Sequence, residues 1–272
     1  MSADSQNPIL GFVWRLEEAA PQVTQMAQQT GSRAIFDFSM METPALESFF
    51  QKADPTCRVR DIKISAGAFR DSALEPWLRE SGALNLWVEC HPREFWENPS
   101  AFLQRMRNVP ENVRCFPIIG DLDILATVLK DPSGIGRIVL KGCEASGFVS
   151  GETTWILYAA AKDMRRDAAA SPEILIWGGV WTPEAAAAFL STGAAGLVFE
   201  SVHWLTDLVA LDAPRRRQLA AIRADSTSLV GLDVQVPCRL FNKGNSEQFQ
   251  QLYKAGLFST EELNEIRLNG MR

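Results

Sequence analysis

The sequence contains few of the residues that build metal sites or disulfide frameworks. Its 272 residues include five cysteines, which are scattered and never occur in a C-x-x-C spacing, and only two histidines. Neither a zinc site nor a set of disulfides is expected from this pattern. We therefore predict no metal ligands in this chain.

The chain also lacks an excess of positive charge and any long apolar run. It carries 27 basic and 33 acidic residues, a net charge of −6, which argues against a nucleic-acid partner. No apolar stretch approaches the roughly 20 residues of a membrane span. The segment Met1–Pro8 lacks the charged start and apolar run of a signal peptide. We expect a cytoplasmic protein that binds neither nucleic acid nor membrane.

Strand-like apolar runs alternate with helix-like segments along most of the chain. This alternation favours a parallel sheet covered by helices, and eight strand-helix units favour a closed (β/α)8 (TIM) barrel over the main alternative, an open doubly wound sheet. The predicted strands are Ile9–Trp14, Arg33–Phe38, Val59–Ser65, Ala83–Cys90, Val113–Ile119, Gly136–Lys141, Glu173–Trp177 and Gly196–Phe199. The predicted helices are Gln22–Gln29, Ala45–Lys52, Ser72–Glu80, Pro99–Arg107, Leu122–Leu129, Glu152–Arg166 and Pro183–Leu190.

The last part of the chain departs from this rhythm. It contains a basic helix start at Arg215–Arg217, a strand-like run at Val234–Leu240, and two helical segments, Ser246–Ala255 and Thr260–Leu268. We therefore predict a barrel over residues 1–211 and a C-terminal helical extension over residues 212–272 that packs on the barrel.

One segment combines two predicted strands with a glycine pair. The strand Glu173–Trp177 stops at Gly178-Gly179, where backbone N–H groups can approach an anion closely. A short helix follows, capped by Thr182, and it ends at Gly193-Ala194 before the last strand. In barrel enzymes the loops after the last two strands commonly bind phosphate. The simpler interpretation, a tight strand-helix connection, stays open.

The loop after the sixth strand carries a second group of candidate residues. It begins at Lys141-Gly142, passes Glu144 and reaches Gly147-Phe148. The glycines would let the backbone approach a planar ligand, while Lys141 could stabilise developing negative charge and Glu144 could orient it or exchange a proton. A surface ion pair is the alternative interpretation.

Two stretches of sequence resemble a known family. KGCEASGFVSGETT, from Lys141, and IWGGVWTPEAAAAFLSTGAAGLVFES, ending at Ser201, are similar to the nitronate monooxygenase (2-nitropropane dioxygenase-like) flavin barrels. The nearest subgroup is the one embedded in polyketide synthase and fatty acid synthase-like proteins, which includes enoyl reductases. The resemblance implies FMN as cofactor, a nicotinamide (NAD(P)H) as reductant, an acyl thioester substrate, and an acyl carrier protein or other synthase domains as partners.

The resemblance also assigns residues. Gly178 and Gly179 match the phosphate loop, Gly193-Ala194 match the turn before the last strand, and Ser201 could donate to the phosphate. Lys141, Gly142, Glu144 and Gly147 match the flavin-facing loop of the synthase subgroup.

Two positions depart from the family pattern. Phe148 stands where nitronate monooxygenases carry a histidine base, so nitronate oxidation through that base is not expected. Glu200 stands where flavin-binding members have glycine, and a carboxylate facing a phosphate is repulsive unless it turns away or is paired.

Other polar residues follow the predicted strands, and His91 is a further candidate. It follows the fourth strand and could donate a proton to a substrate, although a histidine in a His-Pro turn is often only structural. Asp37 and Glu89 could instead form a structural ion pair with Arg15. We thus predict an FMN-dependent oxidoreductase. The alternatives are a flavin-free barrel that serves as a docking domain of a synthase, and a phosphate-binding isomerase or aldolase with Lys141 as its lysine.

Overall fold

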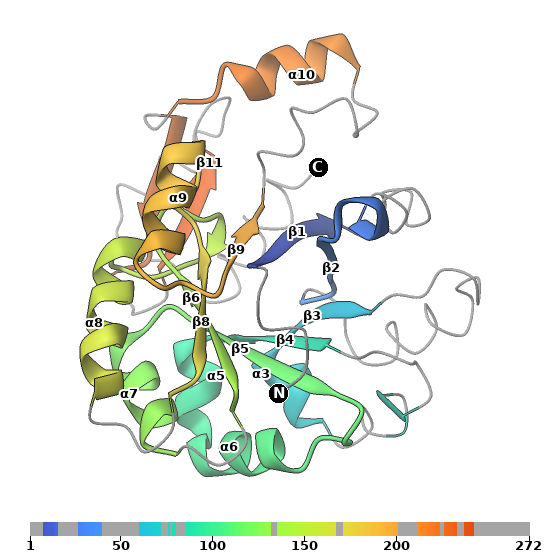
Figure 1. The fold of residues 1–272 in the computed structure, drawn as a ribbon, viewed down its shortest axis with the longest axis vertical. Coiled ribbons are helices and arrows are strands. Elements are labelled where there is room, and N and C mark those ends of the chain that lie inside the picture. Colours follow the sequence, from blue (N-terminus) through green and yellow to red (C-terminus); the bar gives the residue numbers. More distant parts are fainter. Residues whose placement is uncertain are drawn as a thin grey trace.

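Eight parallel strands close into a barrel. The structure is a computed structural model that describes residues 8–15, 27–39, 60–71, 76, 78–79, 85–131, 135–166, 171–200, 212–223, 226–232 and 237–241. The strand order is β1-β2-β3-β4-β5-β6-β8-β9, and β9 pairs with β1 to complete the circle. The predicted (β/α)8 barrel is therefore confirmed (Figure 1). The barrel strands are β1 Ile9–Arg15, β2 Arg33–Asp37, β3 Asp61–Ser65, β4 Asn85–Cys90, β5 Arg114–Ile119, β6 Arg137–Lys141, β8 Glu173–Trp177 and β9 Gly196–Phe199.

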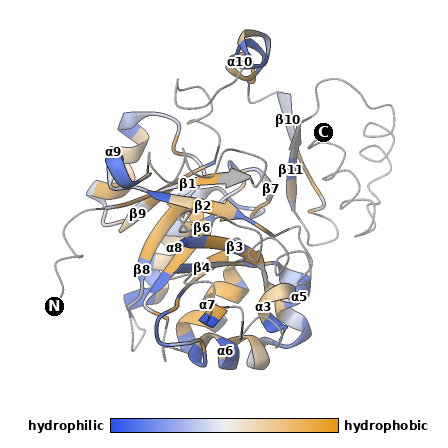
Figure 2. Ribbon diagram, turned by 90° about the vertical axis from the view of Figure 1, so that its right-hand side faces the viewer, coloured by the Kyte–Doolittle hydropathy of each residue, from blue (hydrophilic) through white to orange (hydrophobic). Residues whose placement is uncertain are grey.

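Two apolar clusters build the core, one on each side of the sheet. Side chains alternate along each strand, so every second residue points into the barrel. The inner cluster contains the stacked rings of Trp87 and Phe116 together with Trp177. The outer cluster packs the strands against the helices through residues such as Phe95 and Phe102. In Figure 2 the barrel strands are mostly in the hydrophobic colour, as this double burial requires.

The helices follow the predicted pattern where the structure describes them. Polar side chains cap the N-termini of five of the described helices; Asp121, for example, accepts the N–H groups of Asp123 and Ile124. Two short helices, α3 and α5, were not predicted. The predicted helix Ala45–Lys52 and most of Gln22–Gln29 and Ser72–Glu80 lie outside the described residues. The helices are α3 Ala66–Arg70, α5 Pro92–Glu97, α6 Pro99–Arg107, α7 Leu122–Lys130, α8 Thr154–Arg166, α9 Pro183–Ser191 and α10 Ala213–Ala220.

The C-terminal part adds strands as well as a helix. After α10 the chain forms β10 (Thr227–Val230) and β11 (Cys238–Phe241). These pair in a small antiparallel sheet with β7 (Gly147–Phe148), which belongs to the loop after β6. The predicted strand-like run Val234–Leu240 overlaps β11, whereas β10 was not predicted, so the C-terminal part contains a small sheet beside its helix. The two predicted helices within residues 246–268 lie outside the described residues, and the boundary at residue 211 stays a prediction.

None of the helices in the described ranges is long and apolar enough to cross a membrane.

Candidate active site at the barrel mouth

A chain of four charged side chains lines the carboxyl end of the barrel. Lys63 on β3 lies between two carboxylates, with its Nζ 3.0 Å from Asp37 Oδ2 and 3.1 Å from Glu89 Oε2. Glu89 Oε1 then accepts from Lys141 Nζ at 2.8 Å. The two lysine side chains are almost fully buried. Opposite charges alternate along this chain, so each buried charge is compensated by a neighbour.

Sequence reasoning missed Lys63, although a signal was present. The segment Asp61–Ser65 places Asp61, Lys63 and Ser65 on one side of a buried strand, and a buried lysine requires a partner. The predicted structural ion pair joined Asp37 and Glu89 through Arg15. In the structure Lys63 joins Asp37 and Glu89, and the side chain of Arg15 lies outside the described part of the chain.

Two aspartates on neighbouring strands, Asp37 at the carboxyl end of β2 and Asp61 at the amino end of β3, have opposite pKa shifts. Burial alone would raise the pKa of Asp37, but Lys63 and the hydrogen bonds from Ser39 hold it below its usual value. Burial raises the pKa of Asp61, and the nearby Arg33 and the Trp87 indole only partly oppose this effect. Asp37 is therefore stabilised as a carboxylate, whereas Asp61 is not.

Trp177 lies inside the barrel mouth between the lysines and Glu200. Its ring centroid is 4.7 Å from Lys141 Nζ and 5.5 Å from Lys63 Nζ, within the range of cation–π attraction. Its indole N–H donates to Glu200 Oε2 at 3.2 Å, and the same oxygen accepts the backbone N–H of Ser146 at 2.8 Å. Glu200, the residue that departs from the family pattern, is thus paired with two N–H donors.

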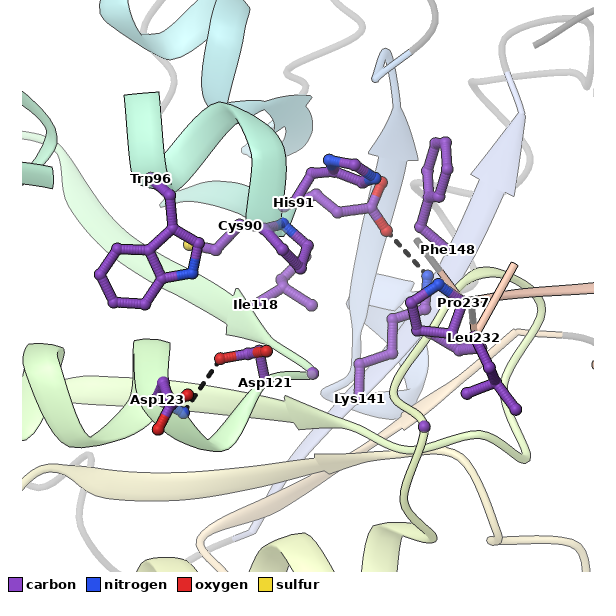
Figure 3. A pocket seen from close by; sticks show the side chains of 15 residues that line it. Cys90, His91, Trp96, Ile118, Asp121, Asp123, Lys141, Phe148, Leu232 and Pro237 are labelled. Carbon is purple, nitrogen blue, oxygen red and sulfur yellow. Dashed lines mark hydrogen bonds and ion pairs between the residues drawn. The ribbon is translucent and has the colours of Figure 1, made fainter. Parts of the chain in front are cut away.

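A pocket of about 280 Å³ opens at the ends of β4, β5 and β6. Lys141 and Glu89 belong to its lining, together with His91 and Phe148. Figure 3 shows that Trp96, Asp121 and Asp123 gather on one side of the pocket, while Lys141, Phe148 and Pro237 lie on the other. Leu232 and Pro237 come from the C-terminal sheet region, so that region forms part of the wall.

His91 and Phe148 lie against each other in this pocket. Their ring centroids are 4.7 Å apart in an edge-to-face arrangement. The His91 imidazole therefore lies beside the position where the resembled family carries its histidine base. Cys90 also lines the pocket, but burial, and next Glu89, raise the pKa of its thiol well above the usual value. It is therefore not a nucleophile at neutral pH.

The loop after β6 is held by close packing. A Cβ on Gly142 would lie 2.0 Å from Thr154 Oγ1, so only glycine fits there. Glu144 accepts both the backbone N–H and the hydroxyl of Thr154, at 2.9 and 2.8 Å, and thereby binds the first residue of α8. Lys141 is paired with Glu89 rather than with Glu144. Gly147, at φ +68°, begins β7.

The structure separates the two predicted halves of the phosphate site. Gly178 and Gly179, with φ of +106° and +70°, follow β8 at the mouth and contact the Ala145 and Glu144 region of the loop. Gly193 and Ala194 donate to carbonyl groups of Leu190 and Phe189. They therefore close the C-terminus of α9 and precede β9, at the opposite end of the barrel. The structure does not bring them to this site, and Ser201 lies outside the described residues.

The residues at the mouth fit a flavin mononucleotide, with one exception. The pocket offers an aromatic and apolar wall for a ring system and the Lys141 cation beside it. The turn at Gly178 and Gly179 has the conformation with positive φ that aims backbone N–H groups at an anion. The exception is Glu200, which adds negative charge near that turn. No group of His, Cys, Asp and Glu side chains that could hold a metal occurs in the described part of the chain.

Solved structures with this fold agree with the resemblance found in the sequence. FabK from Thermotoga maritima matches with a TM-score of 0.70 and 14% identity, over 98% of this chain and 80% of that one. The enoyl reductase domain of MlnA from the macrolactin biosynthesis cluster of Bacillus amyloliquefaciens gives 0.63 and 10%, over 91% and 67%. Nitroalkane oxidase from Streptomyces ansochromogenes gives 0.62 and 11%, over 96% and 83%. The predicted likeness to enoyl reductase and nitronate monooxygenase-like barrels is thus confirmed at the level of the fold.

No protein-family model matches the sequence, and no curated protein matches it either.

Proposed function

We propose that this chain is an FMN-dependent oxidoreductase that reduces an unsaturated acyl thioester in polyketide or fatty acid synthesis. The observation that carries the proposal is the pocket at the ends of β4–β6, which has Lys141 and His91 in its wall and the Gly178-Gly179 turn on a neighbouring strand. The fold similarity to an enoyl reductase domain and to a nitroalkane oxidase supports it. The acyl group would be presented by an acyl carrier protein.

FMN reduced by a nicotinamide would supply a hydride to the substrate. Gly178, Gly179 and Ser201 would hold the phosphate, and Gly142 and Gly147 would keep the loop close to the ring. Lys141 would place a fixed positive charge beside negative charge that develops on the bound groups, and Glu89, at 2.8 Å, holds its ammonium in place. Glu144 would act indirectly, by orienting the loop through Thr154.

His91 is the residue that we assign to proton transfer. Phe148 cannot accept or donate a proton, but the imidazole beside it can. A His91→Asn variant should therefore lose turnover by about 100-fold while retaining FMN.

The first test is the visible absorbance of the purified chain before and after addition of FMN. A bound flavin with the spectrum of an oxidised flavoprotein, bleached by NADH or NADPH and restored by an enoyl thioester, is the expected result. Failure to take up FMN at any concentration would refute this function. It would instead favour the docking-domain alternative, for which Glu200 at the mouth is the specific supporting observation.

A further inference from the structure

Glu200 occupies a small anion-binding cradle made by two other parts of the chain. The backbone N–H of Ser146 and the indole N–H of Trp177 converge on one of its oxygen atoms, at 2.8 and 3.2 Å. A carboxylate can only accept hydrogen bonds, and two N–H donors aimed at one point suit any anionic oxygen equally well. The donors belong to the loop after β6 and to β8. Other parts of the fold therefore hold them in place, independently of Glu200.

Packing holds both donors in place. Trp177 is fully buried, and its ring lies next to the ammonium groups of Lys141 and Lys63. The loop that carries Ser146 lies directly against the turn after β8. A Cβ added to Gly178 would lie only 3.0 Å from the backbone nitrogen of Ala145 in that loop. The cradle and the glycine turn are therefore one contiguous surface.

We infer that Glu200 is an internal competitor for the phosphate group of the cofactor. Its carboxylate fills the cradle next to Gly178-Gly179, and it repels a phosphate monoester that approaches the same surface. Occupation of the site by a phosphate monoester would require the Glu200 carboxylate to leave the cradle. Glu200 thus sets the affinity of the barrel for phosphate-bearing ligands. The inference rests on the proposed function only in naming FMN as that ligand.

The test compares the full-length chain with Glu200→Ala and Glu200→Gln. Glu184→Gln is the matched control, since Glu184 is an exposed carboxylate in the first turn of α9, close in sequence to the same glycine turn but outside the cradle. Each protein is titrated with FMN and with riboflavin, which has the same ring but no phosphate. We expect E200A to bind FMN about tenfold more tightly than the unchanged chain, the effect of removing one competing charged contact. E200Q should show a smaller gain in FMN affinity. The riboflavin affinity of every variant, and the FMN affinity of E184Q, should stay within about twofold of the values for the unchanged chain.

Inorganic phosphate separates failure of this inference from failure of the proposed function. One outcome is that neither the unchanged chain nor any variant binds FMN, but phosphate raises the Tm of E200A and not that of the unchanged chain. This result would support competition between Glu200 and phosphate and would refute the flavin function. If all the proteins bind FMN with equal affinity, the function stands and the role of Glu200 is overturned. An equal gain for riboflavin and FMN would also overturn it, because the phosphate would then be irrelevant. If E200A does not fold, the FMN and phosphate titrations of E200Q serve as the test. This variant keeps an oxygen acceptor for both N–H groups and removes the negative charge.

Discussion

The two halves of the barrel mouth have opposite characters. At the ends of β4–β6 the mouth is open: a pocket of about 280 Å³ is lined by the Lys141 cation, His91 and aromatic rings. At the ends of β8 and β9 the chain fills its own site, since Glu200 accepts the N–H groups of Ser146 and Trp177. The contrast shows that one barrel mouth can hold an open pocket in one half and, in the other, a pair of N–H donors already occupied by a side chain of the same chain.

The chain of buried charges that includes Lys63, Glu89 and Lys141 should be the point at which substitution destabilises the fold most. Glu89 accepts from both Lys63 and Lys141, so Glu89→Ala would leave the Lys141 ammonium buried without its partner. We expect a loss of about 3–5 kcal/mol in the free energy of unfolding, measured by urea denaturation. Glu97→Gln is the control: Glu97 is 65% exposed and paired only with Arg70 among the described ion pairs, so it should cost less than about 1 kcal/mol. Equal losses in the free energy of unfolding for both variants would show that water reaches the charged side chains at the barrel mouth, contrary to their burial in the structure.

The open half should carry the chemistry. Lys141→Met removes the cation from the pocket, whereas Glu89 keeps its contact with Lys63. Turnover of the FMN-loaded enzyme should fall by about 100- to 1000-fold, the usual effect of losing one stabilising donor. Lys130→Met, at an exposed position at the end of α7, should leave turnover unchanged. Unaltered turnover in K141M would remove Lys141 from the mechanism.

The depressed pKa of Asp37 makes part of the stability depend on pH. Because the folded-state pKa lies below the unfolded value of about 3.9, ionised Asp37 stabilises the fold above that value. This contribution is lost as pH falls through the folded-state pKa. The difference in urea midpoint between the unchanged chain and Asp37→Asn should therefore be constant from pH 7 to 5 and shrink below pH 4. A difference that grew on acidification would contradict the assigned direction.

Substitution of Glu144 should have the smallest effect on stability among these variants. It tests whether Glu144 supports α8 or contacts the ligand directly. Its carboxylate accepts from the backbone and hydroxyl of Thr154, so Glu144→Ala should cost about 1 kcal/mol of stability, as loss of a helix cap does. FMN affinity should change by less than about twofold. If E144A instead abolished FMN binding with unchanged stability, Glu144 would be a ligand contact and not a brace for α8.

Local patterns predicted most of the barrel. All eight predicted barrel strands end within two residues of the observed ends, and two of them, Glu173–Trp177 and Gly196–Phe199, coincide with the strands found. The reason is that buried strands are continuous apolar runs between glycine and proline signals. The helices α6, α7 and α9 were predicted for similar reasons. The strand β10 was not predicted, and the small sheet was missed because it depends on the pairing of β11 with β7, in which Cys238 lies opposite Phe148, 90 residues earlier in the chain. No local pattern reports such a contact.

The candidate site was predicted less completely. Lys141, His91 and the Gly178-Gly179 turn were identified because they follow strands, and the carboxyl ends of parallel strands meet at one edge. Gly193-Ala194 were assigned to the same site through the resemblance, but they follow a helix and so lie at the other end of the barrel. Lys63 was overlooked within a strand.

The sequence by itself determined the class of fold and the location of the two loops at the mouth, because hydrophobic periodicity and glycine conformation are properties of short segments. Only the tertiary structure decided the partners of each charge: Lys141 with Glu89, Glu144 with Thr154, and Glu200 with Ser146 and Trp177. The physical reason is that a buried charge must be paired. Its partner is set by which strands meet in the closed barrel, and not by distance along the chain.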